Sequence, residues 1–236
     1  MNNSKLGDIT NLISYDEETY SYKFEKPLTT LAEHQKVLLK NKIGKNNEIL
    51  LPTINEICTN IYPFIEKRSN ELINTLISRN KRIKRLIFNA IEKRKDIELN
   101  FEPLDEKDKF IINLAKSIVH DLNKFIYKYE IGNLYANKTF LNNDINSFYI
   151  GTVDLIAQSK NNIYIATFKI SRSGFNQKYL AELALQKELV ESNLNYKIAD
   201  SFIFNPREER VIIKAHNISK GEFYKMKDFI KFWANN

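Results

Sequence analysis

Two short apolar runs separated by a polar turn constrain the fold of this chain more than any other feature. The runs cover residues 148–157 and 162–170, and Asn161-Asn162 gives the turn signal between them. Short apolar runs bounded by turn residues are typical of β-strands inside a sheet. A similar run at residues 131–141 ends at turn residues 142–144. We therefore predict a three-stranded meander over residues 131–170.

Helical patterns precede this meander. Residues 53–56, TINE, have the Ser/Thr-x-x-Glu form of a capping box. A largely helical region follows to about residue 95, with an interruption near Pro63. A second helix is expected from about Asp105, because apolar residues then recur at three- and four-residue steps.

The pattern after the meander predicts a helix, two strands and a last helix. We place the helix at about 176–192, the strands near 199–204 and 209–215, and the last helix after Ser219. This order indicates an α/β fold, in which a mixed central β-sheet is flanked by helices.

We expect a mainly helical N-terminal region, residues 1–104, packed on a core that comprises residues 105–236. Within the first region, residues 1–30 are expected to be irregular and residues 31–40 to form a short helix.

The composition suits a globular domain and excludes several classes of protein. The 236 residues are 43% hydrophobic and 28% charged, which is enough to bury a core. No apolar run is long enough for a membrane span, and the single Cys58 excludes an intrachain disulfide. We expect a reducing, cytoplasmic location, or the host cytoplasm if the protein is viral. The net charge of +7 points to a polyanionic partner such as nucleic acid, or only to a solubilising surface.

An acid and a base interrupt strands that otherwise have the composition of a core. Asp154 lies in the second predicted strand and Lys169 at the end of the third. Residues two apart in a strand share a face, so Thr167 and Lys169 project together. Charged groups are rarely buried unless they are paired. Asp154 and Lys169 therefore form a structural ion pair, or one of them lies at an exposed strand edge, or they form the start of a metal-dependent hydrolytic site.

These residues resemble the core of the PD-(D/E)XK nuclease superfamily, chiefly its RecB-type and lambda-exonuclease-type branches. In those proteins a Gly-x-x-Asp strand precedes an acid-x-Lys strand, and a helix with a conserved glutamine follows. The matching elements here are Gly151-Thr-Val-Asp154, Thr167-Phe-Lys169, and the helical segment that runs from Tyr179 to Gln186. The specific part of the resemblance covers about residues 110–205.

The chain departs from the superfamily pattern at three positions. Thr167 replaces the second acid, Glu182 stands where glutamine is usual, and Asn137 stands where many relatives carry an acid. Some restriction endonucleases of the superfamily take the second acid from the following helix, about a dozen residues after the lysine. Twelve residues separate Lys169 from Glu182 here, which favours Glu182 as the relocated acid.

Helical geometry places Glu182 toward the core. At 100° per residue, Glu182 and Gln186 fall within the apolar arc of their helix. A glutamate there has a raised pKa, binds a cation, or lies at the sheet edge and reaches water. We expect it to reach a metal or Lys169.

The resemblance implies a site for Mg²⁺ or Mn²⁺. Asp154, Glu182 and the carbonyl of Phe168 would hold the ion, Lys169 would act on the attacking water, and Thr167, Gln186 and Asn137 would be accessory. DNA is the implied substrate. Further candidate contacts to its phosphates are the basic run on the preceding helix and two residues near the site: Arg79, Lys81, Arg82, Lys84, Arg85, Arg172 and Lys178.

The leading prediction is therefore a divalent-metal-dependent DNA nuclease, acting in recombination, repair, replication or genome processing. The main alternative is a catalytically inactive protein with the nuclease fold, which binds nucleic acid or protein partners within a larger assembly. A third is a structural protein in which Asp154 and Lys169 form only an ion pair.

Overall fold

The computed structural model describes residues 13–16, 21–24, 42–44, 47–63, 69–95, 97–142, 148–170, 176–207 and 211–235. The elements in chain order are β1 (Ile13–Asp16), β2 (Ser21–Phe24), α3 (Ile54–Ile61), α4 (Asn70–Glu92), α5 (Lys109–Lys128), β3 (Asn133–Leu141), β4 (Ile150–Gln158), β5 (Ile163–Phe168), α6 (Gln177–Leu194), β6 (Ile198–Phe204), β7 (Ile212–Lys214) and α7 (Lys220–Asn235). None of the helices in these ranges is both long and apolar enough to cross a membrane.

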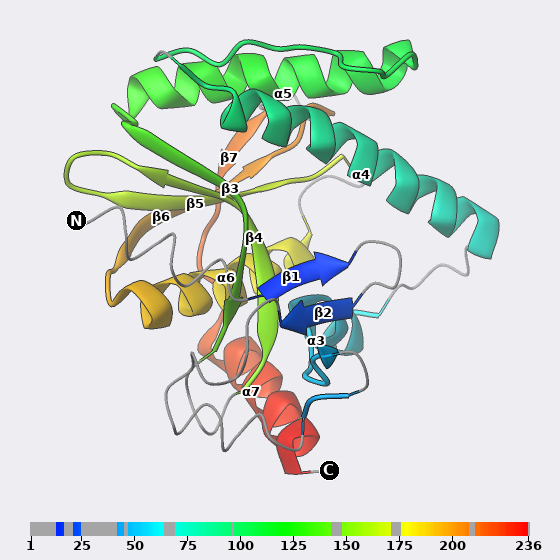
Figure 1. The fold of residues 1–236 in the computed structure, drawn as a ribbon. Helices are drawn as coiled ribbons and strands as arrows, with labels where there is room; N and C mark the ends of the chain where they lie inside the picture. Colours follow the sequence, from blue (N-terminus) through cyan, green and yellow to red (C-terminus); the bar gives the residue numbers. More distant parts are fainter. Residues whose placement is uncertain are drawn as a thin grey trace.

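A five-stranded mixed sheet forms the centre of the molecule (Figure 1), with the order β3-β4-β5-β6-β7. The predicted meander β3-β4-β5 is confirmed and is antiparallel throughout. Helix α6 connects β5 to β6, and these two strands pair in parallel, as such a crossover requires. Strand β7 adds an antiparallel edge beside β6. The fold is therefore the α/β class expected from the sequence, compatible with a restriction-endonuclease-like core.

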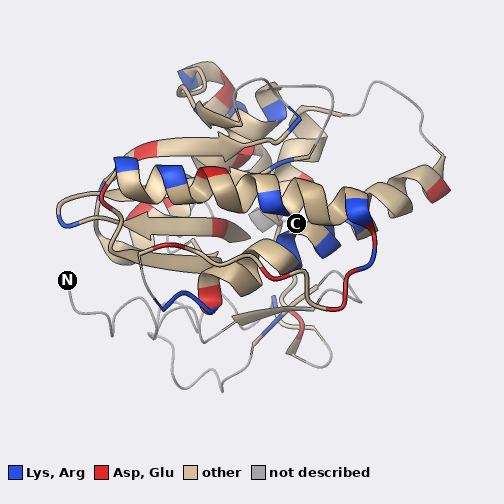
Figure 2. Ribbon diagram, turned by 90° about the horizontal axis from the view of Figure 1, so that it is seen from above, with Lys and Arg blue, Asp and Glu red and all other residues tan. Residues whose placement is uncertain are grey.

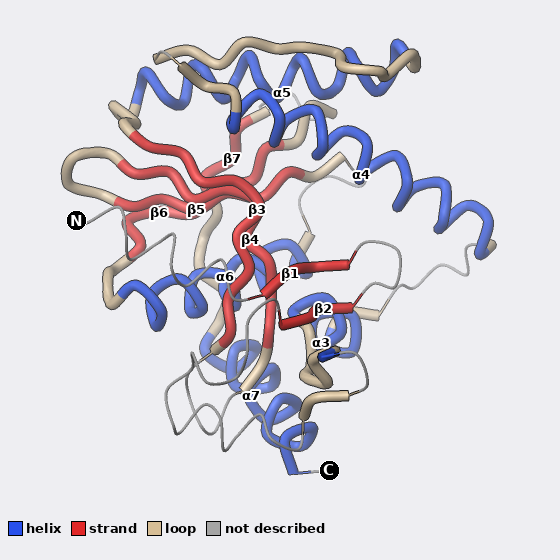
Figure 3. The backbone as a smooth tube through the Cα atoms, viewed as in Figure 1, coloured by secondary structure: helices blue, strands red, loops and turns tan. Residues whose placement is uncertain are grey.

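Helices cover both faces of this sheet (Figure 3). Side chains of α4 and α5 pack on one face, where they meet alternate residues of β5 such as Tyr164, Ala166 and Phe168. Side chains of α3, α6 and α7 pack on the opposite face, where they meet Ile163 and Ile165. The alternation along β5 explains why this strand is apolar throughout: both of its faces are covered.

The N-terminal part differs from its prediction in one respect. Residues expected to be irregular form an antiparallel hairpin, β1–β2, which packs against Leu141, Phe148 and Ile150 at the end of β3 and β4. Each of these strands has only four residues, too few for a clear alternating pattern. The helix expected at 31–40 lies outside the described residues.

The capping box at the start of α3 is confirmed. Glu56 N donates to Thr53 Oγ1, and Thr53 N donates to Glu56 Oε2. These two bonds satisfy backbone donors that the first helical turn leaves open, and so fix where α3 begins. From this position α3 packs against α6 and α7 below the sheet.

Candidate active site

The site lies where strands β3, β4 and β5 lose their regular pairing. Between β3 and β4 the registered pairs Ala136–Leu155 and Lys138–Val153 flank Asn137, which has a φ of 51°. A positive φ is uncommon for residues other than glycine, and such backbone is enriched at functional sites. On the other side, the pairing of β4 with β5 ends at Leu155–Ala166. The ladder is thus open at Asp154, on both sides of its strand.

The Asp154 carboxylate is buried and accepts four hydrogen bonds. Lys84 Nζ lies 2.7 Å from each of its oxygens, Thr167 Oγ1 donates to Oδ2 at 2.8 Å, and Phe168 N donates to Oδ2 at 2.9 Å. Burial by itself raises the pKa of Asp154, but Lys84 and Lys169 oppose it, and the net pKa is lowered. Asp154 is therefore held as a carboxylate.

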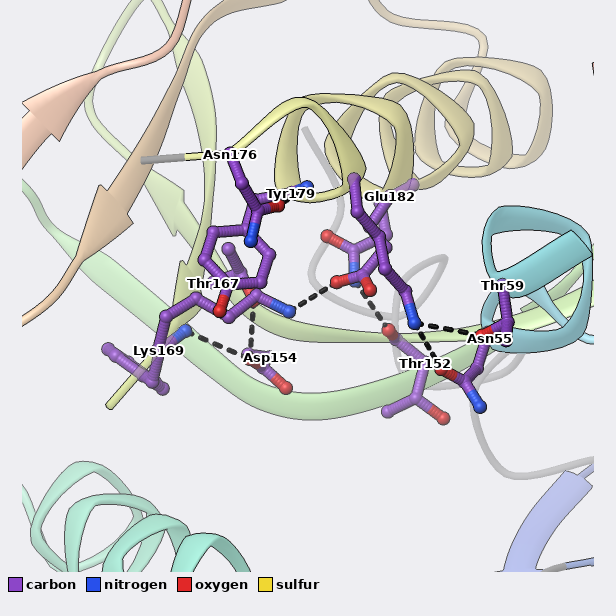
Figure 4. Close-up of polar contacts among 12 residues, drawn as sticks. Asn55, Thr59, Thr152, Asp154, Thr167, Lys169, Asn176, Tyr179 and Glu182 are labelled. Carbon is purple, nitrogen blue, oxygen red and sulfur yellow. Dashed lines mark hydrogen bonds and ion pairs between the residues drawn. The ribbon is translucent and has the colours of Figure 1, made fainter. Parts of the chain in front are cut away.

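Lys169 reaches the second acid. Its Nζ donates to Glu182 Oε2, and it lies 4.7 Å from the centre of the Tyr179 ring. Figure 4 shows the Lys169 side chain running past Asp154 to Glu182, so both carboxylates act on one ammonium group. Burial lowers the pKa of Lys169, but Glu182 and Asp154 together raise it above its ordinary value. Lys169 is therefore a partly buried ammonium group.

Helix α6 supplies the rest of the site from one face. It begins after Asn176, whose side chain accepts from Tyr179 N. One turn after Glu182, buried Gln186 donates from Nε2 to the Thr152 carbonyl at 2.9 Å. Burial of Lys178 lowers its pKa, and its Nζ donates to Thr59 Oγ1 of α3 at 2.8 Å. The helical periodicity placed Glu182 and Gln186 toward the core, and the structure agrees.

The structure brings together five of the six residues predicted to be catalytic or accessory: Asp154, Thr167, Lys169, Glu182 and Gln186. The expected contact of Glu182 with Lys169 is confirmed, whereas the alternative of a direct Asp154–Lys169 ion pair is not what the structure shows. Asp154 has Lys84, not Lys169, as its direct ionic partner, because Lys169 is long enough to reach Glu182 and does so. The backbone N of Phe168 contacts Asp154, while its ring packs in the α4–α5 core. Asn137 is exposed, beside the gap in the ladder.

The basic run on α4 is largely engaged within the chain. Arg82 pairs with Glu106, and Arg85 pairs with Asp105 at 2.6 Å. Arg79 lies over the ring of Phe110 at 5.1 Å. Figure 2 colours the acidic and basic positions of this region. A nucleic acid that binds here would compete with these contacts, so the role of this run as a phosphate contact stays a prediction.

Two contributions to the site were not predicted. Lys84 was expected on the nucleic-acid path, yet it lies on Asp154, and Tyr179 covers Lys169. The available signal for Lys84 was its place in α4, between buried Ile83 and the buried pair Leu86 and Ile87. A lysine on the flank of an apolar stripe often extends along it toward a buried partner. Arg172 lies outside the described residues.

Comparisons with known proteins add little to this description. No protein-family model matches the chain, and no curated protein sequence matches it. A crystal structure described as "Putative exonuclease" from Eubacterium rectale is 11% identical, covers 86% of this chain and 83% of its own, and has a TM-score of 0.46. The crystal structure of SSO0001 is 11% identical, covers 86% and 85%, and has a TM-score of 0.38. VC1899 from Vibrio cholerae is 10% identical, covers 94% of this chain and 67% of its own, and has a TM-score of 0.29.

At these identities the class of the protein rests on its own strand order and flanking helices. These define an α/β protein with a mixed five-stranded sheet, and the polar site lies at the break in its central strands.

Proposed function

We propose that the protein is a divalent-metal-dependent nuclease that hydrolyses phosphodiester bonds in DNA. One observation carries this proposal: an acid from β4, a lysine following β5 and an acid from α6 lie in one buried site (Figure 4). Asp154 and Glu182 would bind the metal, and Lys169 would act on the attacking water.

The donor chemistry of the site fits one hard divalent cation. Carboxylate and amide oxygens are the ligands that Mg²⁺ and Mn²⁺ prefer. Gln186 Oε1 is buried and accepts no hydrogen bond from the residues that the structure describes, so this amide oxygen, one turn after Glu182 on α6, would be available as a further ligand. Over the same residues, no group of three or more His, Cys, Asp and Glu side chains is arranged to hold a metal. The fit therefore depends on two acids and neutral oxygens.

A bound Mg²⁺ or Mn²⁺ would polarise the phosphate and acidify a water molecule. The protein's own contributions follow from the contacts. Lys169, kept as a partly buried cation by Glu182 and Asp154, would stabilise negative charge that develops on the phosphate oxygens. Thr167 and Phe168 N fix the orientation of Asp154. The Tyr179 ring, 4.7 Å from Lys169 Nζ, adds a cation–π contact to this ammonium group.

The test is a cleavage assay with purified protein on linear duplex, circular duplex and single-stranded DNA. Each substrate is incubated with Mg²⁺, with Mn²⁺ and with a chelator. We expect degradation only with metal, and its loss in Asp154→Asn, Lys169→Met and Glu182→Gln. Lys124→Met is the matched control, because Lys124 is an exposed lysine of α5 that lies away from the site. It pairs with Asp121 at 2.8 Å. Circular dichroism at the assay temperature checks that every variant is folded. Cleavage that persists in all three site variants would contradict the proposal.

A second function is favoured by a different observation. Thr167 occupies the place of the strand acid, and Lys84 covers Asp154. We propose as the alternative a nuclease-fold protein without catalysis, which binds nucleic acid through this lysine-rich site. In the same assays, retardation of DNA on a gel with no degradation under any metal condition would favour this alternative.

A further inference from the structure

Lys84 reaches Asp154 from a helix 70 positions earlier in the chain. It extends from α4, and its Nζ lies 2.7 Å from Oδ1 and 2.7 Å from Oδ2. An ammonium group centred on both oxygens takes the position in which a cation binds a carboxylate through two oxygens. The Asp154 side chain is 8% exposed and that of Lys84 is 29% exposed, so this cation is only partly shielded from water.

The four hydrogen bonds saturate Oδ2 of the Asp154 carboxylate and leave Oδ1 to Lys84. An ionised carboxylate offers about four lone-pair sites. Three of the bonds fall on Oδ2, from Lys84, Thr167 Oγ1 and Phe168 N, whereas among the residues that the structure describes Oδ1 accepts only from Lys84. A metal ion that approaches Oδ1 therefore meets the like charge of the Lys84 ammonium group unless Lys84 leaves.

Lys84 is the donor best able to leave. Phe168 N belongs to the backbone of β5, and the Thr167 hydroxyl is on a short, buried side chain of the same strand. Lys84 has a flexible four-carbon stem and a partly exposed side chain, so its ammonium group can return to water. Lys169 is no substitute competitor, because Glu182 engages it.

We propose that Lys84 is a built-in competitor of the divalent metal: it occupies Asp154 in the metal-free protein and must be displaced before the ion binds. This inference rests on the proposed function, since it assumes that Asp154 is a metal ligand. It makes Lys84 a positioning residue that sets metal affinity, instead of the phosphate contact expected from the sequence.

The experiment measures Mn²⁺ binding by isothermal titration calorimetry, without DNA. Lys84→Met removes the charge and keeps the length of the side chain, whereas Lys84→Arg keeps the charge. We expect Lys84→Met to bind Mn²⁺ roughly 10- to 100-fold more tightly than the parent protein, because the metal no longer has to break a charged hydrogen-bond pair. Lys84→Arg should stay close to the parent. Adding Asp154→Asn to Lys84→Met should abolish the gain, and Lys124→Met should bind like the parent.

Thermal unfolding gives a second readout. Without metal, Lys84→Met should melt at a lower temperature than the parent, because the buried negative charge of Asp154 loses its ammonium partner. Saturating Mn²⁺ should raise its melting temperature more than that of the parent, because a ligand stabilises in proportion to its affinity. If Lys84→Met does not fold without metal, Lys84→Gln provides a neutral side chain that still donates a hydrogen bond.

The outcomes separate this inference from the proposed function. If the parent, Lys84→Met and Lys84→Arg bind Mn²⁺ equally, and Asp154→Asn removes binding from all, the metal site stands and the competition does not. If none of the proteins binds Mn²⁺, both proposals are overturned.

Discussion

Replacing Glu182 by Gln removes the charge that faces Lys169 and keeps the shape of the side chain. The two side chains are 12% and 18% exposed, so the pair is largely buried. Removing one partner of a buried ion pair costs about 3–5 kcal/mol. Asp154 still acts on Lys169 in this variant, so we expect the lower end, about 3 kcal/mol. For a chain of this length, 1 kcal/mol lowers Tm by about 2–4 °C, so Tm should fall by roughly 6–12 °C.

A double-mutant cycle measures the free energy of interaction between Glu182 and Lys169. Lys169→Met alone leaves the Glu182 carboxylate buried without its ammonium partner, whereas the double variant removes both charges. We expect the double variant to be more stable than the sum of the single costs predicts, with a coupling of roughly 2–3 kcal/mol. Urea unfolding of the four proteins measures it. The exposed Lys93–Glu102 pair, whose side chains are 55% and 54% exposed, should give less than about 1 kcal/mol in the same cycle. Additive costs for Glu182 and Lys169 would refute the reasoning.

Three further predictions concern the helices and the strand around the site. Thr53→Ala removes the hydroxyl of the capping box and should cost about 1 kcal/mol in urea unfolding, whereas Thr53→Ser should cost little. Gly151→Ala places a Cβ 2.6 Å from Ile54 Cγ1, so we expect the free energy of unfolding to fall by about 1–3 kcal/mol. Adding Ile54→Ala to the same protein should partly relieve this loss, and an unchanged Tm in Gly151→Ala would contradict the prediction. Hydrogen bonds, chiefly from the Ser219 and Tyr62 hydroxyls, hold the pKa of Glu222 at about 2, below its ordinary 4.5. The stability lost in Glu222→Gln should therefore be constant above pH 5 and shrink between pH 4.5 and 2; a difference that does not change with pH would contradict it.

The meander, α5 and α6 could be predicted because their signals are local. Short apolar runs with turn residues between them define β3, β4 and β5 without reference to distant contacts. Glu182 could be placed as well, because the helical period alone turns it toward the same side as Gln186.

Long-range partners could not be predicted in this way. The Lys84–Asp154 contact joins residues 70 positions apart, and although the apolar neighbours of Lys84 place it on the flank of a buried stripe, nothing in the sequence names the distant acid that it reaches. Arg82 and Arg85 contact acids in the segment before α5, which was expected to lie within that helix. The open ladder at Asn137 depends on a backbone conformation that the sequence permits but does not require.

The arrangement of charges explains why threonine occupies position 167. Thr167 lies against Asp154 and donates a hydrogen bond to it, so an aspartate there would set two buried carboxylates beside each other. Like charges in such a pair raise the pKa of one acid unless a metal lies between them. With the second acid on α6, each carboxylate has its own ammonium group: Lys84 for Asp154 and Lys169 for Glu182. The fold then tolerates both acids, and under our proposal a metal ion would have to displace Lys84 from Asp154.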